Sequence, residues 1–334
     1  MTHTILTLNG GSSSVKYGVY VQKGNAVRET ASGDVEHAGA DTALFETIGA
    51  IVPDAIGHRI VHGGAALFAP VVIDPAVIAQ LRHAAAFAPL HGPAALAMIA
   101  LAQARFPDAV QVACFDTGFH ADMPAIAATL PIPAAFRADG VRRYGFHGLS
   151  CESILAQLGE ALPDRLIIAH LGNGASVTAV RGGRSVDTSM GLTPAGGVVM
   201  GTRTGDIDPG VLLYLMREHG MDADAVETLV DRRSGLLGLS GLSADLRVLH
   251  AADAPAAALA IRIFCRSVAK QIAGMLVTLG GADLIVFTGG IGEHDALVRD
   301  AILGALRWAG DVPMRVVPSQ ENAQIARHVA ALLG

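Results

Sequence analysis

The stretch Thr4–Val19 reads TILTLNGGSSSVKYGV, and its pattern predicts the fold class of the chain. A β-rich apolar run ends at Leu8, small and polar residues follow, and apolar residues then alternate with other residues from Val15 onward. This pattern is typical of a strand, a tight turn and a second strand. Its glycines let backbone N–H groups approach a phosphate, and Lys16 adds a positive charge. A Walker A loop is excluded because Lys16 is followed by Tyr17 in strand order rather than by a helix. A plain polar hairpin turn is the alternative interpretation.

The same pattern occurs again about half a chain further on. The apolar residues 166–169 precede the turn His170–Ser176, and strand-like alternation follows. Two such units suggest an internal duplication, with one unit in each domain. A third glycine-rich turn, Thr288–His294, leads into a helical pattern over Asp295–Trp308, an arrangement suited to holding a nucleotide against backbone amides. Further helices are predicted at Pro75–Ala86, Pro93–Arg105, Pro209–Glu218, Ala225–Arg232, Pro255–Leu279 and Gln320–Leu333.

Length and composition limit the class of protein. The chain has 334 residues, more than a single core usually holds, and strands alternate with helices, so we expect an α/β protein with two domains. Hydrophobic residues make up 51% of the chain, but its most apolar stretch, Ile272–Ile291, is interrupted by Asp283, so no membrane span is expected. The N-terminus lacks a secretory pattern, and three scattered cysteines fit a reducing cytoplasm. A net charge of −6 without a run of Lys or Arg disfavours nucleic-acid binding.

Arg59 and Asp116 are charged residues in apolar surroundings. Arg59 lies inside the run Gly57–Gly64, where a guanidinium has to be paired, and its planar fork suits a carboxylate or a phosphoryl group. Asp116 follows the apolar residues 112–115 at a strand end, where α/β proteins usually place ligands. It would either help to position Mg²⁺ or accept and donate a proton. The alternatives are a structural ion pair for Arg59 and a helix or turn cap for Asp116.

Two glycine-rich segments carry further cationic groups. The segment Arg142–Gly148 contains His147, which could donate to an oxygen of a transferring phosphoryl group. The segment Asp187–Pro209 presents Arg203 from a loop, as phosphoryl-transfer arginines usually are. The alternatives are a packed, hydrogen-bonded histidine and a surface arginine on a glycine-rich turn.

Taken together, these segments resemble the acetate kinase family over nearly the whole chain. Seven motifs occur in the order expected of that family, which makes chance implausible. They are Asn9–Tyr17 (NGGSSSVKY), Phe115–His120 (FDTGFH) with Met123-Pro124, Arg143–Gly148 (RYGFHG), His170–Gly174 (HLGNG), Met200–Asp206 (MGTRTGD), Ser234–Gly238 (SGLLG) through Asp245–Arg247, and Gly290–Glu293 (GIGE).

The resemblance implies a fold and an activity. The fold would consist of two duplicated actin-like (ribonuclease H-like) α/β domains with the active-site cleft between them. The first domain would span residues 1–117 and be completed by the C-terminal helix 322–334, and the nucleotide-binding domain would span residues 118–321. The activity would be the reversible, ATP- and Mg²⁺- (or Mn²⁺-) dependent phosphorylation of a short-chain carboxylate, foremost acetate to acetyl phosphate, by direct in-line transfer. Propionate or butyrate is the first alternative, and a non-catalytic nucleotide-binding regulator is a distant one. A cytoplasmic homodimer without nucleic-acid or membrane partners is also expected.

The resemblance assigns roles residue by residue. The catalytic residues would be Arg59, Asp116, His147 and Arg203. Arg59 would also bind the substrate carboxylate, beside an apolar acyl pocket made of Val61, Leu90, Phe146 and Pro194. ATP or ADP would be bound by Ser12, Ser14 and Lys16, by His170, Leu171, Gly172, Asn173 and Gly174, by Asp245, Leu246 and Arg247, and by Gly290, Ile291, Gly292, Glu293 and His294. The metal site would include Asn9 and Glu321.

The chain departs from the family pattern in a few places. It is several dozen residues shorter than typical members, with losses expected between Tyr20 and Gly57 and between Ala309 and Val317. Three residues differ from those usual in the family: His294 replaces Asn, Leu149 replaces Thr and Cys151 replaces His. The match around Glu321 is loose. None of these departures removes a proposed catalytic group.

Overall fold

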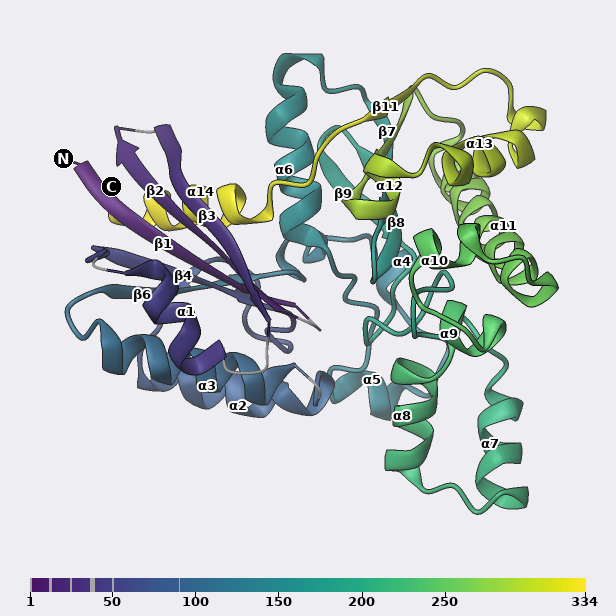
Figure 1. The fold of residues 1–334 in the computed structure, drawn as a ribbon, viewed down its shortest axis with the longest axis horizontal. Helices are drawn as coiled ribbons and strands as arrows, with labels where there is room; N and C mark the ends of the chain where they lie inside the picture. The colour runs from purple at the N-terminus through teal and green to yellow at the C-terminus, as the bar shows by residue number, and fades with distance from the viewer. Residues whose placement is uncertain (1, 12–13, 25, 37–39, 50, 90) are drawn as a thin grey trace. The chain divides into compact units, whose positions relative to one another are not determined.

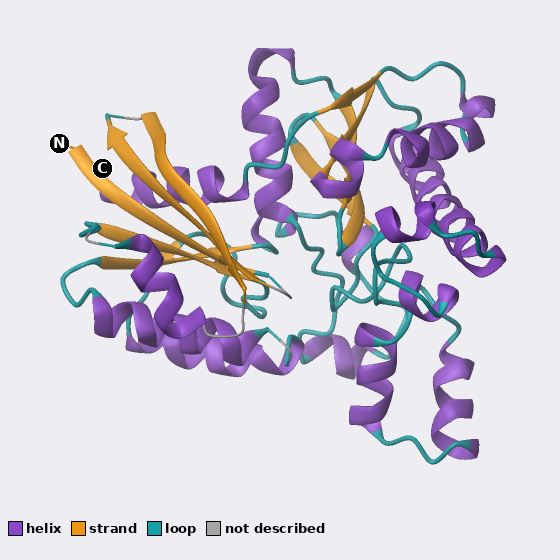
Figure 2. Cartoon of the chain, viewed as in Figure 1, coloured by secondary structure: helices purple, strands orange, loops and turns teal. Residues whose placement is uncertain are grey.

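The computed structural model describes residues 2–11, 14–24, 26–36, 40–49, 51–89 and 91–334, and these form two compact units (Figure 1). Unit 1 comprises residues 1–121, 147–156 and 320–334, and unit 2 comprises residues 122–146 and 157–319. Each unit combines a mixed β-sheet with helices, which confirms the predicted α/β class (Figure 2). Within the described residues, no helix has the length and apolar character needed to cross a membrane. The predicted cleft between the domains stays a prediction.

The sheet of unit 1 is built around the predicted N-terminal hairpin. Its strands are β1 (Thr2–Gly10), β2 (Ser14–Lys23), β3 (Ala26–Glu36), β4 (Ala55–Ile60), β5 (Val71–Val72) and β6 (Val110–Phe115), in the spatial order β3-β2-β1-β4-β6-β5. The antiparallel pair β1–β2 sets Asn9 opposite Lys16, and the N–H of Gly11 donates to the carbonyl oxygen of Ser14 over 2.8 Å. Strands β1, β4 and β6 run parallel. Their carboxyl ends therefore lie at one edge of the sheet.

The sheet of unit 2 repeats this strand order. Its strands are β7 (Arg165–Leu171), β8 (Ala175–Arg181), β9 (Arg184–Thr188), β10 (Leu284–Thr288) and β11 (Met314–Val316), in the order β11-β10-β7-β8-β9. As in unit 1, the first three strands in the chain pair antiparallel, and the next strand runs parallel to the first. β11 in turn runs parallel to β10, as β6 does to β4. The repetition of both order and direction confirms the duplication predicted from the two turns.

The helices of unit 1 cover its sheet and bring the end of the chain back to its beginning. They are α1 (Ala40–Ile48), α2 (Pro75–Ala84), α3 (Gly92–Arg105), most of α6 (Gly148–Leu158) and α14 (Glu321–Leu333). Figure 1 shows α14, at the yellow end of the chain, beside the purple strands β1–β3, with which it is in contact. Ile325 and Val329 of α14 pack with Ile5, Cys114 and Leu149 in one core cluster. Leu149 also lies in this cluster, and residues 147–156 are grouped with unit 1, whereas the predicted boundary between the domains stays a prediction.

The helices of unit 2 are α4 (Ala125–Ala128), α5 (Ala134–Ala138), α7 (Pro209–Glu218), α8 (Ala223–Arg232), α9 (Gly235–Ser240), α10 (Leu246–Ala251), α11 (Pro255–Leu279), α12 (Gly289–His294) and α13 (Ala296–Ala305). Four short 3₁₀ turns complete the described elements: η1 (Ala85–Phe87), η2 (Gly118–His120), η3 (Gly159–Ala161) and η4 (Arg307–Ala309). The central helix α11 packs on β7 and β8. It begins at Pro255 and ends before Gly280, which has φ +68°, so the start and stop residues agree with its predicted bounds.

Candidate active site

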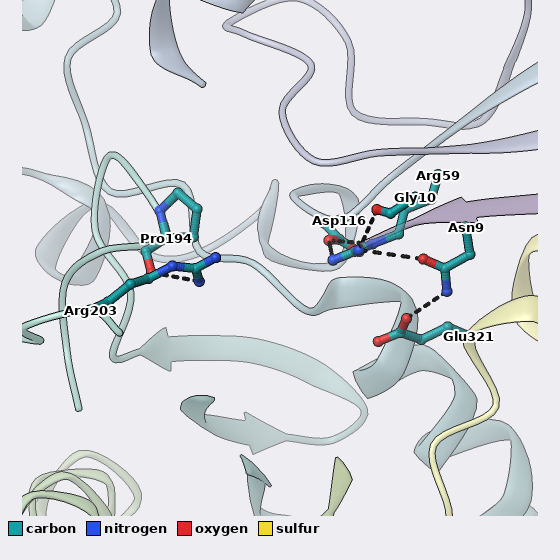
Figure 3. Close-up of polar contacts among 7 residues, drawn as sticks. All are labelled: Asn9, Gly10, Arg59, Asp116, Pro194, Arg203 and Glu321. Atoms are coloured by element: carbon teal, nitrogen blue, oxygen red, sulfur yellow. Dashed lines mark hydrogen bonds and ion pairs between the residues drawn. The ribbon is translucent and has the colours of Figure 1, made fainter. Parts of the chain in front are cut away.

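In unit 1, the predicted residues Arg59 and Asp116 lie side by side. Arg59 is the penultimate residue of β4, and Asp116 directly follows β6. The N–H of Asp116 donates to the carbonyl oxygen of Ile60 over 2.9 Å, which holds the two strand ends together. Nε of Arg59 donates to Oδ2 of Asp116 over 2.9 Å, and Nη2 contacts the same oxygen (Figure 3). The structural ion pair considered as an alternative for Arg59 is therefore present, at the edge of the sheet where ligands bind in α/β proteins.

Asn9 and Glu321 join this pair from opposite ends of the chain. Nη1 of Arg59 donates to the carbonyl oxygen of Gly10 over 3.1 Å and lies 3.4 Å from Oδ1 of Asn9. Nδ2 of Asn9 donates to Oε2 of Glu321, the first residue of α14, over 2.9 Å. Figure 3 shows this chain of contacts from Asp116 through Arg59 and Asn9 to Glu321. We call these four residues the polar cluster.

Burial and neighbouring charges set the protonation of the polar cluster. Burial raises the pKa of Asp116 to about 6; Arg59 opposes this rise, and Glu321 adds to it. Burial disfavours the charge of Arg59, but Asp116 and Glu321 raise the pKa of the guanidinium above its ordinary value. A buried carboxyl group with a pKa near the physiological range, beside a fixed cation, is typical of catalytic sites.

His147 lies against Asp116 through the backbone. The N–H of Gly148 donates to the carbonyl oxygen of Asp116 over 2.8 Å, and a Cβ at position 148 would lie 2.3 Å from that oxygen. His147 itself has φ 60°, and no other non-glycine residue among those described has a positive φ. It is also buried, with 7% of its surface exposed. A buried histidine with a positive φ, next to a residue that bonds to the backbone of Asp116, points to a functional role.

The other predicted residues of unit 1 divide into three groups. Val61 lines a small, mainly apolar cavity whose wall is rich in alanine and also includes Leu81, Ile99, His62 and His91. Ser14 and the exposed Lys16 lie on β2. This strand pairs with β1, which carries Asn9 of the polar cluster. Ser12 and Leu90 lie outside the described residues.

In unit 2, two of the predicted nucleotide segments meet at the carboxyl ends of β7 and β10. His170 and Leu171 are the last two residues of β7 rather than part of the turn, Gly172–Gly174 follow the strand, and Gly290–His294 lies in α12 directly after β10. His170 and Thr288 face each other in the parallel register. Gly289 has φ +76°, and a Cβ there would lie 2.7 Å from the carbonyl oxygen of Leu171, so this close approach requires glycine.

The third segment, Asp245–Arg247, lies in the same neighbourhood of unit 2. The N–H of Gly201 donates to the carbonyl oxygen of Asn173 over 3.3 Å, and a Cβ on Gly201 would lie 3.5 Å from that of Ala244. His250 of α10 pairs with Asp295, just after α12, at 2.9 Å. The three predicted nucleotide segments are therefore adjacent.

Individual side chains of these segments have structural partners. Asp245 caps α10 and pairs with the exposed Arg247. Oε1 of Glu293 accepts from the N–H groups of Gly289 and Ser319 over 3.0 and 2.9 Å. This carboxylate therefore connects the first residue of α12 to Ser319. Leu246 is buried and His294 is exposed. The carboxylates of Asp245 and Glu293 are therefore engaged within the protein.

Arg203 is presented by the glycine-rich loop of unit 2, as predicted. Its Nη1 donates to the carbonyl oxygen of Pro194 over 3.3 Å (Figure 3). The same atom lies 3.7 Å from Sδ of Met200. Its Nε lies 4.0 Å from Oδ1 of Asp231. Pro194 is half-buried, and Phe146, predicted for the same acyl pocket, is 1% exposed.

Sequence reasoning assigned no role to two residues near this loop. Arg143 donates through Nη1 to the carbonyl oxygens of Thr188, Ser189 and Met190 over 2.8, 3.2 and 3.2 Å, and so fixes the segment that leads into the loop. Its place in the motif Arg143–Gly148 was the available signal. Asp231 pairs with Arg203 across 28 positions, and nothing in the local sequence around it indicates this contact.

Comparison with known proteins gives a consistent result. The model of the Acetokinase family matches residues 51–325. An acetate kinase of Methylocella silvestris is 39% identical over 398 aligned positions, which include 100% of this chain and 98% of that protein. The crystal structure of a propionate kinase from Francisella tularensis matches with 33% identity and a TM-score of 0.88, covering 98% of each chain. That of Porphyromonas gingivalis acetate kinase matches with 32% identity and a TM-score of 0.84, covering 99% of this chain and 100% of that one.

Proposed function

This chain belongs to the acetokinase family and is a kinase with a carboxylate acceptor, and from that premise we propose that it reversibly phosphorylates acetate with ATP and Mg²⁺. In the forward direction, a carboxylate oxygen of the acid attacks the γ-phosphorus of ATP, the bond to the bridging oxygen of ADP breaks, and an acyl phosphate forms. The observation that carries the proposal is the buried Arg59–Asp116 pair inside the polar cluster.

Unit 1 is proposed to bind the acid. The guanidinium of Arg59 would neutralise the acid's carboxylate and the incoming phosphoryl group, whose negative charges otherwise repel each other. Val61 and the apolar cavity beside it would accommodate the acyl group. His147 would donate to a phosphoryl oxygen, and Asp116 would orient Arg59 or handle a proton.

Unit 2 is proposed to bind the nucleotide. The glycine-rich segments His170–Gly174 and Gly290–His294 would contact its phosphates through backbone N–H groups, and Asp245–Arg247 would lie against the adenosine. Arg203 would neutralise charge that develops on the phosphoryl group during transfer. Ser12, Ser14 and Lys16 are also proposed to contact ATP or ADP.

The donors of the polar cluster fit a magnesium ion. Oδ1 of Asp116 is buried and makes no hydrogen bond with the described residues, and Glu321 provides a second carboxylate. Mg²⁺ is usually bound by one or two carboxylates together with water and substrate phosphates. Among the described residues, no group of three or more His, Cys, Asp or Glu side chains could hold a metal. Asn9 and Glu321, with Asp116, would hold the ion. When bound, it would neutralise phosphate charge.

The test is ADP formation by the purified protein with acetate, propionate and butyrate, each with and without Mg²⁺. We expect ADP to form only when both acid and metal are present, and the reverse reaction to make ATP from acetyl phosphate and ADP. Equal ATP hydrolysis with and without acid would reject the proposed phosphorylation of a carboxylate. Nucleotide binding without turnover would favour the alternative of a non-catalytic nucleotide-binding regulator.

Propionate is the second candidate, because alanines line the cavity beside Val61 and the Francisella relative is a propionate kinase. An apolar pocket separates neighbouring acids by only about 1–3 kcal/mol per methylene. The ratio of kcat/KM for the three acids decides between them. A homodimer, implied by the family resemblance, stays a prediction that light scattering after gel filtration would check.

A further inference from the structure

Arg203 lies on a loop that is tied to the end of α8 on both sides of that residue. Oγ1 of Thr202 donates to the carbonyl oxygen of Asp231 over 2.7 Å. The N–H of Thr204 donates to the carbonyl oxygen of Val230 over 3.0 Å. These two bonds fix the backbone of Arg203 against the last turn of α8, which ends at Arg232.

The side chain of Arg203 turns toward the same segment. Its Nε lies 4.0 Å from Oδ1 of Asp231, and the two side chains are largely buried, with 14% and 18% of their surfaces exposed. On its other side, Nη1 of Arg203 donates to the carbonyl oxygen of Pro194 over 3.3 Å. A guanidinium has five N–H donors in a rigid fork, so it can bind a carboxylate on its Nε side and a phosphoryl group on its Nη side at once.

Burial and the neighbouring guanidinium act on the pKa of Asp231 in opposite directions. Burial raises the pKa of this carboxyl group, and Arg203 is the main influence that lowers it. Glu227 and Arg232, both on α8, act on Asp231 with opposite signs. The guanidinium of Arg203 is therefore the main neighbouring group that favours the ionised form of Asp231.

We propose that Asp231 is a positioning residue, which holds the guanidinium of Arg203 in the orientation that the transferring phosphoryl group requires. The inference rests on the proposed function, because it needs Arg203 to act on that group. Without the carboxylate, a long side chain samples more orientations, and fewer of them are productive. Since Arg203 acts mainly in the transition state, this loss should lower kcat and leave KM nearly unchanged.

The test compares variants of the full-length protein in the ADP-forming assay with acetate, ATP and Mg²⁺. Asp231→Asn removes the charge and keeps the size of the side chain. The backbone carbonyl oxygen that accepts from Thr202 is not changed. We expect kcat to fall by about five- to tenfold, with KM for ATP and acetate within about twofold of wild type. Asp231→Glu keeps the charge and should recover at least about half of wild-type kcat. Glu227→Gln, the matched control, removes the same charge one turn earlier on α8 and should retain wild-type kcat.

The double variant separates positioning from a general structural role. In an Arg203→Ala background, Asp231→Asn should change kcat by less than about 1.5-fold, because the group that it positions is absent. An equal fall in both backgrounds overturns the proposal, and so does wild-type or higher kcat in a folded Asp231→Asn protein. Thermal unfolding is recorded for every variant, and Asp231→Ser replaces Asp231→Asn if the latter does not fold.

The same experiment distinguishes failure of the inference from failure of the proposed function. If the proposed function is wrong, wild type forms no ADP with acetate, or Arg203→Ala matches wild type, and the inference falls with it. If only the inference is wrong, the kcat of Arg203→Ala falls by about 100-fold or more. Asp231→Asn then either lowers kcat equally in both backgrounds or keeps wild-type or higher kcat.

Discussion

Arg59→Ala is the substitution that tests the polar cluster most directly. It removes the cation from beside a buried carboxylate, together with the hydrogen bond to Gly10 and the contact with Asn9. Two effects have to be separated. The variant loses the proposed ligand of acid and phosphoryl group, and it leaves Asp116 in an apolar site without its cation.

Proton uptake limits the loss of stability. In wild type, the difference between a pKa of about 6 and the ordinary value of 3.8 means that ionised Asp116 already opposes folding by about 3 kcal/mol. Without Arg59 the pKa rises further, and once it passes 7 the carboxyl group takes up a proton at pH 7. The opposition to folding then stops growing at about 4 kcal/mol, which is about 1 kcal/mol more than in wild type. One or two lost hydrogen bonds add about 1 kcal/mol each, so we expect a total destabilisation of about 2–4 kcal/mol.

The sign of the pH dependence follows from the same shift. Because the pKa of Asp116 is raised on folding, its contribution to stability is most favourable below pH 3.8 and is lost as the pH rises through about 6. In Arg59→Ala this loss continues to higher pH. The variant should therefore be closest to wild type at pH 5, where Asp116 is protonated in both proteins, and furthest from it at pH 8.

Activity should fall much further than stability. Loss of one preorganised donor to a transferring group lowers the rate by about 100- to 1,000-fold, and the KM for the acid should rise because Arg59 also binds its carboxylate. Urea unfolding with a chelator at pH 5, 7 and 8, and ADP formation across acid concentrations, measure the two effects. Arg165→Ala is the control, because its ion pair with Asp283 is exposed to solvent and should contribute little to stability. Activity that falls only in proportion to the unfolded fraction would refute the reasoning, as would an unchanged KM and kcat.

Three further predictions concern single residues. Arg203→Ala should lower kcat by about 100-fold or more with little change in KM, and wild-type kinetics in the folded variant would contradict its role. Gly57→Ala should destabilise the protein by about 1–3 kcal/mol in thermal unfolding, since its Cβ would lie 2.4 Å from Cγ2 of Ile325; an unchanged Tm would contradict this packing. Burial lowers the pKa of His58 to about 4, so the folded protein should lose up to about 3 kcal/mol of stability as the pH falls from 6.5 to 4. His58→Gln, which can still bond to Gln111, should flatten that part of the urea profile.

The elements that sequence patterns predicted well are those whose signals are local. The hairpin β1–β2 follows from alternation around a glycine turn, and α11 from a proline at its start and a glycine after its end. The missed strands lack such signals. β3 is an edge strand with many exposed positions, and all three residues of β11 are exposed, so neither shows a buried alternating face.

The candidate site divides in the same way. Glycine and charged motifs identified Arg59, Asp116 and Arg203 as individual residues. Their partners depend on tertiary structure: Asn9 and Glu321 are 312 positions apart, and Arg59 and Asp116 are 57 apart. No local pattern specifies such pairs, because the parallel register of β1, β4 and β6 and the return of α14 bring them together.

The shorter length of this chain is compatible with an intact site for a physical reason. Its alignment to the Methylocella relative spans 398 positions, while the chain has 334 residues. Losses were expected between Tyr20 and Gly57 and between Ala309 and Val317, yet β3 and α1 still occupy the first stretch and β11 the second. Sheet order fixes where strands end, and loops tolerate deletion far better than strands do. The polar cluster lies at the ends of β1, β4 and β6 and at the start of α14, so shortening confined to the two predicted stretches should leave the spacing of its groups unchanged.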